Sequence, residues 1–172
     1  MEVIENTQLK EKKKRIYSKL GYAQQEAEQI VKMLNLLLAN YSVHYQKLRN
    51  FHWNVTGPEF FDIHEKFEEQ YNEAKVNIDA IAERIRVFGK TPLSKMRDYL
   101  DVAEIEERDT DLSAEAMVAD IINDYRILLE FMFSCVEEAL EYGDSGTEDM
   151  VKGFIKQIET HHWMMSAFAS KM

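Results

Sequence analysis

The sequence predicts an all-α fold, a bundle of four long helices in one domain, and three observations lead to this prediction. Apolar side chains recur every three or four positions through four long segments, which is the spacing of a buried helix face. Six Gly and two Pro among 172 residues are too few for the closely spaced turns of a β-sandwich or barrel. The length suits one domain with a sizeable core.

The first two predicted helices end at turns that contain glycine and proline, Gly57-Pro58 and Gly89 to Pro92. The apolar stripe of the first helix consists of Ile30, Leu34, Leu37, Tyr41, Tyr45, Leu48 and His52. The stripe of the second helix consists of Phe60, Phe67, Tyr71, Ala74, Ile78, Ile81 and Ile85.

The third and fourth predicted helices have stripes over residues 117–140 and 150–168, with a glycine-containing turn over residues 143–146 between them. Residues 91–111 connect the second helix to the third, and they include a predicted short helix over residues 92–100 that Ser94 caps. One long crossover between the second and third helices is typical of the ferritin-like bundle, whereas an up-and-down bundle has only short loops.

Charge divides the chain into a basic arm, residues 1–22, which we expect to be mobile, and a bundle domain, residues 23–172. Residues 1–20 carry six basic and three acidic side chains, or +3, so the remainder carries −13 of the total charge of −10. Such an arm can bind DNA through its phosphates, although a solvated terminus explains it equally well. The residues concerned are Lys10, Lys12, Lys13, Lys14 and Arg15.

Composition excludes several other classes of protein. A single Cys rules out a disulfide framework and a zinc site built from paired cysteines. The chain has no apolar run of 18 residues, and its first residues do not resemble a secretion signal. We therefore expect a cytoplasmic protein that does not associate with a membrane.

Ligand-type side chains gather on the second predicted helix. His64 and Glu68 are four residues apart, as are Asp79 and Glu83, and this spacing stacks two side chains on one face. At about 100° per residue, all four lie within a sector of about 100° beside the apolar stripe. His52, on the stripe of the first helix, can add one more ligand. The pattern indicates a metal site, although a solvated charged flank has the same spacing.

The two pairs on this helix are too far apart to bind one metal ion within one chain, because about 22 Å of helix separates them. A second copy of the helix, antiparallel about a two-fold axis near residues 73–74, brings residues 64 and 68 of one chain opposite residues 79 and 83 of the other. Two-fold dimers are the commonest symmetric assembly. We therefore expect two equivalent sites, each shared between two chains.

The ligand types favour particular metals. Two imidazoles with three carboxylates suit Fe(II) or manganese better than a metal that prefers thiolates. Calcium and magnesium sites more often use carboxylates and carbonyls without histidine. Zinc remains chemically possible because imidazole binds it well.

These residues match the pattern of the Dps group, also called mini-ferritins. The pattern is His-Trp, a His twelve residues after the first, an acid four later, an Asp eleven further on and a Glu four after that. In this chain it falls at His52-Trp53, His64, Glu68, Asp79 and Glu83. The similarity extends through residues 91–93 to His162-Trp163 and covers about residues 28–168. One position departs from the pattern, since the family usually has Asp where this chain has Glu68.

The resemblance implies a hollow shell of twelve subunits that oxidises Fe(II), preferably with hydrogen peroxide, stores the ferric product as a mineral and protects DNA from oxidative damage. It implies two iron ions per site, held by His52, His64 and Glu68 of one chain with Asp79 and Glu83 of the other. Asp149 falls where members of the family line an iron-entry pore. Trp53 is a candidate sacrificial electron donor, although packing is the commoner role for such an aromatic residue.

Other interpretations stay open. Glu159 and His162 have the Glu-x-x-His spacing that larger ferritins use twice to build a di-iron site inside one bundle, but the second helix has no matching copy. The chain can also be a nucleoid protein that coats DNA through its basic arm, with secondary metal chemistry. We expect His44 to be a satisfied polar residue or a surface residue, and Cys135 to be a small core residue.

Overall fold

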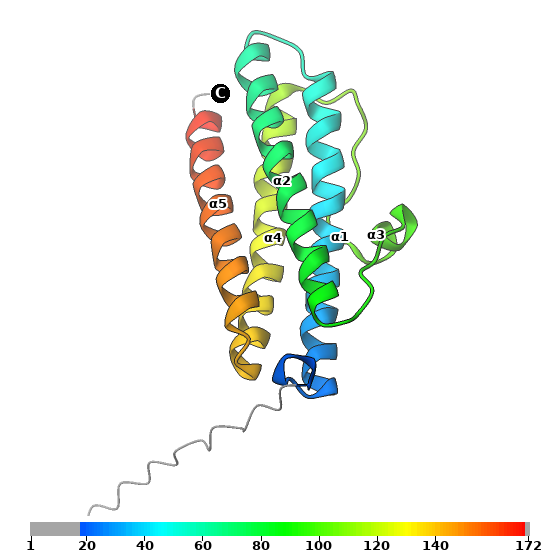
Figure 1. Cartoon of the computed structure of the whole chain (residues 1–172). Coiled ribbons are helices and arrows are strands. Elements are labelled where there is room, and N and C mark those ends of the chain that lie inside the picture. The colour runs from blue at the N-terminus through cyan, green and yellow to red at the C-terminus, as the bar shows by residue number, and fades with distance from the viewer. Residues whose placement is uncertain (1–17, 171–172) are drawn as a thin grey trace, which may run out of the picture.

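The computed structural model describes residues 18–170 and confirms the all-α fold, with four long helices packed side by side (Figure 1). In chain order the elements are the 3-10 turn η1 (Ser18–Gly21), α1 (Gln24–Asn54), α2 (Phe60–Val87), α3 (Met96–Val102), α4 (Ala114–Tyr142) and α5 (Ser145–Ala169). Helices α1 and α5 run in one direction and α2 and α4 in the other (Figure 1). The crossover between α2 and α4 therefore returns along the bundle, and it carries α3.

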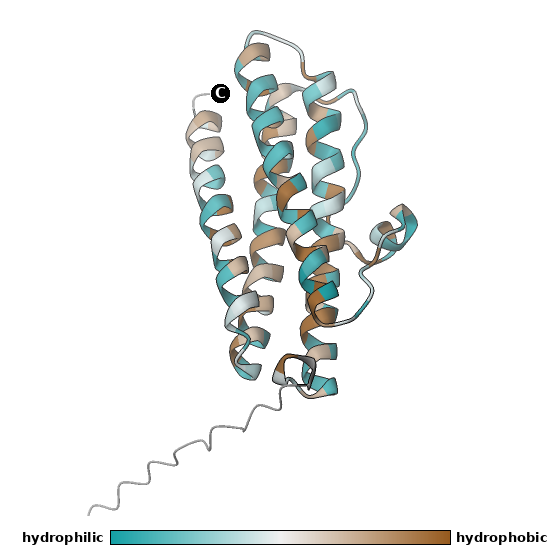
Figure 2. Ribbon diagram, in the orientation of Figure 1, coloured by the Kyte–Doolittle hydropathy of each residue, from teal (hydrophilic) through white to brown (hydrophobic). Residues whose placement is uncertain are grey.

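Helix α1 is the most enclosed element of the bundle. Residues 37–44 are all buried, whereas a helix packed on one side buries only a stripe. Helices α2 and α4 pack on α1, and α3 lies against its outer side (Figure 1). Hydrophobic residues recur along every long helix among hydrophilic ones (Figure 2). The largest fully buried side chains include Tyr41, Phe51, Phe67 and Tyr125.

Two asparagines of α1 hold the crossover in place on either side of α3. Asn35 Oδ1 accepts a hydrogen bond from the backbone N–H of Leu93 at 2.8 Å. Asn40, which is fully buried, accepts from the N–H groups of Glu104 at 2.9 Å and Ile105 at 3.0 Å. Because backbone donors that leave water need a partner, these amides let a long irregular segment lie against a buried helix.

The predicted cap of the short crossover helix is wrong. Helix α3 begins at Met96 with Lys95 at its N-cap, and no side chain caps it. Leu93 is held to α1 by Asn35, and its carbonyl accepts from the hydroxyl of Tyr99 at 2.8 Å. Lys95 itself has an extended backbone, with φ of −101° and ψ of 139°, so the helix starts later than Ser94.

Asp144 joins three parts of the chain at one end of the bundle. It is fully buried, and its Oδ1 caps α5 by accepting from the N–H of Thr147 at 3.1 Å. The same oxygen pairs with Arg84 of α2 and accepts from the hydroxyl of Tyr22 at 3.2 Å. The last residue of the predicted arm, Tyr22, therefore contacts the bundle. Gly143 precedes the cap with φ of 69°, a conformation that favours glycine.

A buried ionic cluster lies between α1, α4 and the end of the crossover. Asp124 accepts from His44 Nδ1 at 2.9 Å and from Lys47 Nζ at 2.8 Å, and Lys47 also pairs with Asp120 at 2.8 Å. Arg108 of the crossover pairs with Asp120 at 2.7 Å. Burial opposes the ionisation of Asp120, but the bonds from Arg108 and Lys47 outweigh it and lower the pKa of this carboxyl. His44 is thus a satisfied polar residue, as expected.

Cys135 is a buried core residue, as expected, and burial raises the pKa of its thiol to about 12. Across residues 18–170, no helix has the length and apolar character needed to cross a membrane.

Candidate metal centre

His52 and His64 face each other where the end of α1 meets the start of α2. Their rings stack with centroids 3.8 Å apart and an interplanar angle of 20°. His52 Nδ1 lies 2.8 Å from the backbone oxygen of His64, and His64 Nδ1 lies 2.7 Å from the backbone oxygen of His52. The short turn between α1 and α2 brings the two backbones close enough for this reciprocal pair of bonds.

These bonds determine which ring nitrogen is available to a metal. A carbonyl oxygen only accepts, so each Nδ1 must donate its hydrogen. In a neutral ring the Nε2 atom of His52 or His64 then carries the free lone pair. Partners of this kind fix the tautomer and orientation of metal-binding histidines. Nε2 is therefore the ring nitrogen of each histidine that is available to a metal ion.

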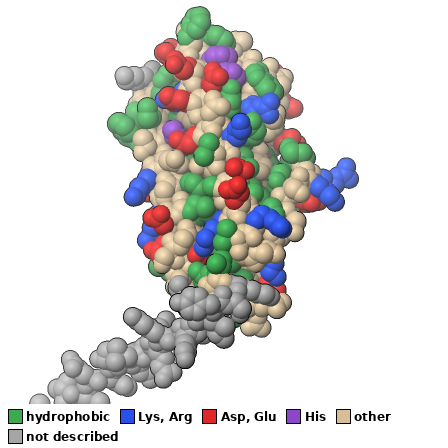
Figure 3. Space-filling view, viewed as in Figure 1, with side chains coloured by type: hydrophobic (Ala, Val, Ile, Leu, Met, Phe, Trp, Pro, Cys, Tyr) green, Lys and Arg blue, Asp and Glu red, His purple; other side chains and the backbone are tan. Residues whose placement is uncertain are grey.

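Glu68 completes a compact group of possible ligands, one turn along α2 from His64. One ligand atom from each of His52, His64 and Glu68 can be chosen such that all three lie within 4.8 Å of one another. His52 is buried, His64 is half-buried and Glu68 is exposed, so the group opens to solvent on one side. Histidine side chains lie beside acidic ones near the upper end of the face in Figure 3. Two imidazoles with a carboxylate suit a divalent transition metal such as Fe(II).

Tyr71 is a neighbour of this group that the sequence pattern did not single out. Its hydroxyl donates to Glu68 Oε1 at 3.2 Å, and its ring stands perpendicular to that of His52 with centroids 5.3 Å apart. Partial burial, and then the bond to the Glu68 carboxylate, raise the pKa of the Tyr71 phenol. Tyr71 falls on the apolar stripe of α2, which is why its sequence position suggested only packing.

The other two predicted ligands lie far along α2 from this group. Asp79 and Glu83 are exposed, and the sector of α2 on which they stand adjoins the buried stripe that includes Ile81 and Ile85. Neither carboxylate forms a hydrogen bond or ion pair with another residue in the range 18–170. The separation from Glu68 to Asp79 is eleven residues, or about 16 Å of helix, so one chain does not bring all five residues together.

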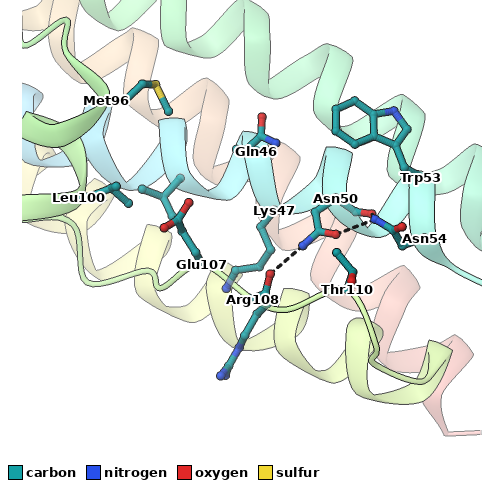
Figure 4. A pocket seen from close by; sticks show the side chains of 11 residues that line it. Gln46, Lys47, Asn50, Trp53, Asn54, Met96, Leu100, Glu107, Arg108 and Thr110 are labelled. Atoms are coloured by element: carbon teal, nitrogen blue, oxygen red, sulfur yellow. Dashed lines mark hydrogen bonds between the residues drawn. The ribbon is translucent and has the colours of Figure 1, made fainter.

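Trp53 points away from His52, although the two are adjacent in sequence, because successive residues on a helix are about 100° apart. Its side chain is 57% exposed and lines a surface cleft of about 240 Å³ between α1, α3 and the crossover (Figure 4). The Arg49 guanidinium lies over the indole at 4.7 Å from its centroid. In the described part of the chain, the indole makes no ring contact with His52 or His64.

The alternative site inside the bundle is not assembled from Glu159 and His162, since both side chains are exposed on α5. Instead, His161 Nε2 contacts Glu73 Oε1 of α2 at 2.9 Å. The only group of three or more potential ligands among residues 18–170 is the one around His52.

The remaining predicted functional residues lie elsewhere. Asp149 is exposed in the second turn of α5. Its place in an iron-entry pore stays a prediction. The basic residues of the predicted arm lie outside the described residues: Lys10, Lys12, Lys13, Lys14 and Arg15.

Comparison with known proteins gives a consistent result. The family model of the ferritin-like domain matches residues 31–172. The chain is 41% identical over 144 residues to DNA protection during starvation protein 2 of Bacillus anthracis, a match that covers 84% of this chain and 99% of that protein. It is 38% identical over 142 residues to general stress protein 20U of Bacillus subtilis, covering 83% of this chain and 98% of that protein.

Solved structures agree with these matches. A Dps protein from Vibrio cholerae O1, described as a ferritin-like diiron-carboxylate protein, superposes with a TM-score of 0.84 at 34% identity, over 86% of this chain and 93% of that one. A Dps protein from Bacillus brevis superposes with a TM-score of 0.82 at 39% identity, over 85% of this chain and 98% of that one.

Proposed function

Because the chain belongs to the ferritin-like domain family, and within it to the Dps proteins, we propose that it oxidises Fe(II) and stores the iron. The observation that carries the proposal is the group formed by His52, His64 and Glu68, whose ligand atoms lie within 4.8 Å of one another. The backbone bonds that leave both Nε2 atoms free to bind a metal support it further. The name of the Vibrio cholerae relative as a diiron-carboxylate protein points to two irons per site.

Each site is completed by a second copy of the chain. Asp79 and Glu83 stand exposed on α2 at about the distance that an antiparallel partner helix bridges when its two-fold axis passes near residues 73–74. His52, His64 and Glu68 of one chain then face Asp79 and Glu83 of its partner.

The donor set fits the oxidation of Fe(II). Carboxylates stabilise the higher charge of Fe(III), which favours loss of the electron, and open positions remain for the oxidant. Hydrogen peroxide is the preferred oxidant in this proposal: two Fe(II) ions give one electron each, and peroxide is reduced to water without release of hydroxyl radical. The ferric product is stored inside a hollow shell of twelve subunits, where the charge of −13 on residues 21–172 favours cations.

This activity protects DNA from oxidative damage in the bacterial cytoplasm, in line with the names of the Bacillus anthracis and Brevibacillus brevis relatives. Iron that is oxidised with peroxide at the protein is no longer available to generate radicals near DNA. Protection of this kind needs no contact with DNA.

The test is to add Fe(II) without oxygen and then hydrogen peroxide or oxygen, and to follow ferric product by ultraviolet absorbance. The wild type should oxidise iron faster with peroxide, and His52→Ala and Asp79→Ala should each lose most of that rate. Glu65→Ala, which removes an exposed acid next to His64, is the matched control and should keep it. Unchanged oxidation in both site variants would contradict the proposed site.

A nucleoid-binding function is the second candidate, and the basic arm favours it. Deletion of residues 1–17 removes the basic residues Lys10 to Arg15. If the arm binds DNA, this deletion should abolish retardation of DNA in a gel and leave iron oxidation intact. Binding of the wild type should also weaken steeply with added salt, because phosphate contacts release counterions. DNA retention that survives the deletion would exclude the arm as the binding segment.

A further inference from the structure

We propose that Glu73 of α2 and His161 of α5 hold a divalent transition-metal ion between these two helices, at a site that lies within one chain. On a helical wheel Glu73 is about 180° from His64 and about 120° from Asp79, so it stands on a different flank of α2 from the residues of the shared centre. The inference therefore needs neither a partner subunit nor the proposed oxidation of iron.

The two side chains already lie at about the spacing of ligands that share one metal ion. His161 Nε2 is 2.9 Å from Glu73 Oε1. Two ligand atoms bound at about 2.1 Å each, with an angle of about 90–109° between them, lie about 3.0–3.4 Å apart. An ion therefore replaces the proton between these atoms with little movement of either helix. An imidazole and a carboxylate suit divalent transition metals such as Fe(II), Co(II) or Zn(II).

Side-chain amides lie one turn along both helices from this pair. Asn77 follows Glu73 by four residues on α2, so the two side chains share a face. In the same way Gln157 precedes His161 on α5, and Asn77 Nδ2 donates to Gln157 Oε1 at 3.1 Å. Residues 18–170 place no third acidic or histidine side chain beside the pair, and Gln157 Oε1 supplies the third ligand. Solvent completes the coordination, because the Glu73 side chain is 31% exposed.

The charge around the pair favours a cation. Within residues 18–170, Glu73 pairs with His161 but with no lysine or arginine. Burial raises the pKa of the Tyr41 and Tyr125 phenols, and the negative charge of Glu73 adds to the shift of both. The carboxylate thus acts on the interior of the bundle, where a bound cation balances its charge.

Two buried polar atoms beside the pair have no partner in the described part of the chain, His161 Nδ1 and Gln70 Nε2. Both residues contact Tyr125, whose ring stacks on that of His161 with centroids 6.3 Å apart and whose hydroxyl donates to Gln70 Oε1. Buried polar atoms nearly always have a hydrogen-bond partner. These unsatisfied atoms indicate that the space between α2 and α5 accepts a further polar group, as an ion with its bound water is.

The test uses the full chain with His52→Ala and Asp79→Ala combined, so that both halves of the shared centre lack a ligand. Co(II) is the probe, because its visible absorption changes when an imidazole binds it. Equilibrium dialysis of this background variant should show one Co(II) per chain with the absorption of imidazole-bound cobalt. Adding His161→Ala should weaken this binding at least tenfold. Glu73→Gln should weaken it similarly, although its amide oxygen still accepts the hydrogen bond from His161.

The matched control is His162→Ala in the same background, which removes the exposed histidine next to His161 and should leave cobalt binding unchanged. Circular dichroism checks that each variant keeps its helices. Cobalt binding that survives both His161→Ala and Glu73→Gln would overturn the inference, as would a background variant that binds no cobalt. Neither result bears on iron oxidation by the wild type, which tests the proposed function separately.

Discussion

The two histidines of the candidate centre are oriented by each other's backbone. Metal-binding histidines commonly donate their second ring nitrogen to a carboxylate or a carbonyl. Here the carbonyl oxygens of His52 and His64 accept these bonds, so no acidic side chain is needed for orientation. Glu68 is therefore not used to orient the histidines, and neither ring can turn without breaking its bond to the other residue.

At the same scale, the buried ionic cluster predicts a large loss of stability when one member is removed. Asp124→Ala leaves Lys47 and His44, both almost fully buried, without their shared partner. Removing one side of a buried ion pair costs about 3–5 kcal/mol. Urea denaturation of Asp124→Ala should show a loss of this size in the free energy of unfolding. The control Glu130→Ala breaks an exposed ion pair on the same helix and should lower that free energy by about 0.5 kcal/mol or less. Equal losses would contradict the role given to the cluster.

The lowered pKa of Asp120 predicts a specific dependence of stability on pH. A carboxyl whose pKa is lower in the folded state stabilises the fold fully above its unfolded value, 3.8, and this stabilisation is lost as pH falls through the folded value. Asn at this position has no proton to gain. The free energy of unfolding of Asp120→Asn, measured by urea denaturation at one protein concentration, is expected to lie below that of the wild type. This difference should shrink as the solution becomes acidic. A deficit that stays constant across the acid range would count against the ion pairs.

Sequence spacing anticipated the residues that the structure brings together at the centre, because two ligand-type side chains four apart on a helix must share a face. It did not anticipate Tyr71, since periodicity assigns a tyrosine to a stripe but does not say where its hydroxyl points. The pair formed by Glu73 and His161 was also missed. These residues are 88 positions apart, and their contact depends on how α2 and α5 pack.

At the scale of elements, the crossover is what distinguishes this bundle from a simple one. It covers the outer side of α1, where a continuous run of residues is buried. Asn35 and Asn40 satisfy three backbone donors of the crossover from within α1. The hydrophobic surface of α1 is thereby covered without the crossover itself being regular.

Replacing Asn40 should release the end of the crossover. Asn40→Leu leaves the N–H groups of Glu104 and Ile105 without their acceptor, and each buried unsatisfied group costs about 1–3 kcal/mol. We expect urea denaturation to show that the free energy of unfolding falls by at least about 1–3 kcal/mol. The backbone amide of Ile105 should also exchange its hydrogen faster. Asn72→Leu, at an exposed asparagine of α2, is the control and should change neither. Unaltered exchange at Ile105 would show that other contacts hold the segment.

The four long helices were predictable because glycine marks each break, with proline at the first two, and the apolar period is helical throughout. The start of α3 was not, since it depends on the bond from Leu93 to Asn35, which joins residues 58 positions apart. The N-cap of α5 at Asp144 was not predicted for a similar reason. Its burial and its pairing with Arg84 arise only when α2 and α5 meet.

At the scale of the whole molecule, the proposal assigns to one chain the halves of two different sites. The group at His52 holds three ligands, while Asp79 and Glu83 lie about 22 Å away along α2 from the pair that includes His64. In the proposed arrangement a partner related by two-fold symmetry unites them, which makes the proposed activity a property of the dimer. An isolated chain should bind metal weakly and oxidise it slowly.

The most direct test of this claim is co-expression of His52→Ala and Asp79→Ala chains with different affinity tags, followed by purification through both tags. In a mixed dimer one site carries both defects and the other carries none. In the proposed shell of twelve subunits, random pairing makes half of the dimers mixed, so about one site in four is intact and iron oxidation with peroxide should return to about a quarter of the wild-type rate. Mixed oligomers no more active than either variant alone would contradict a site shared between two chains.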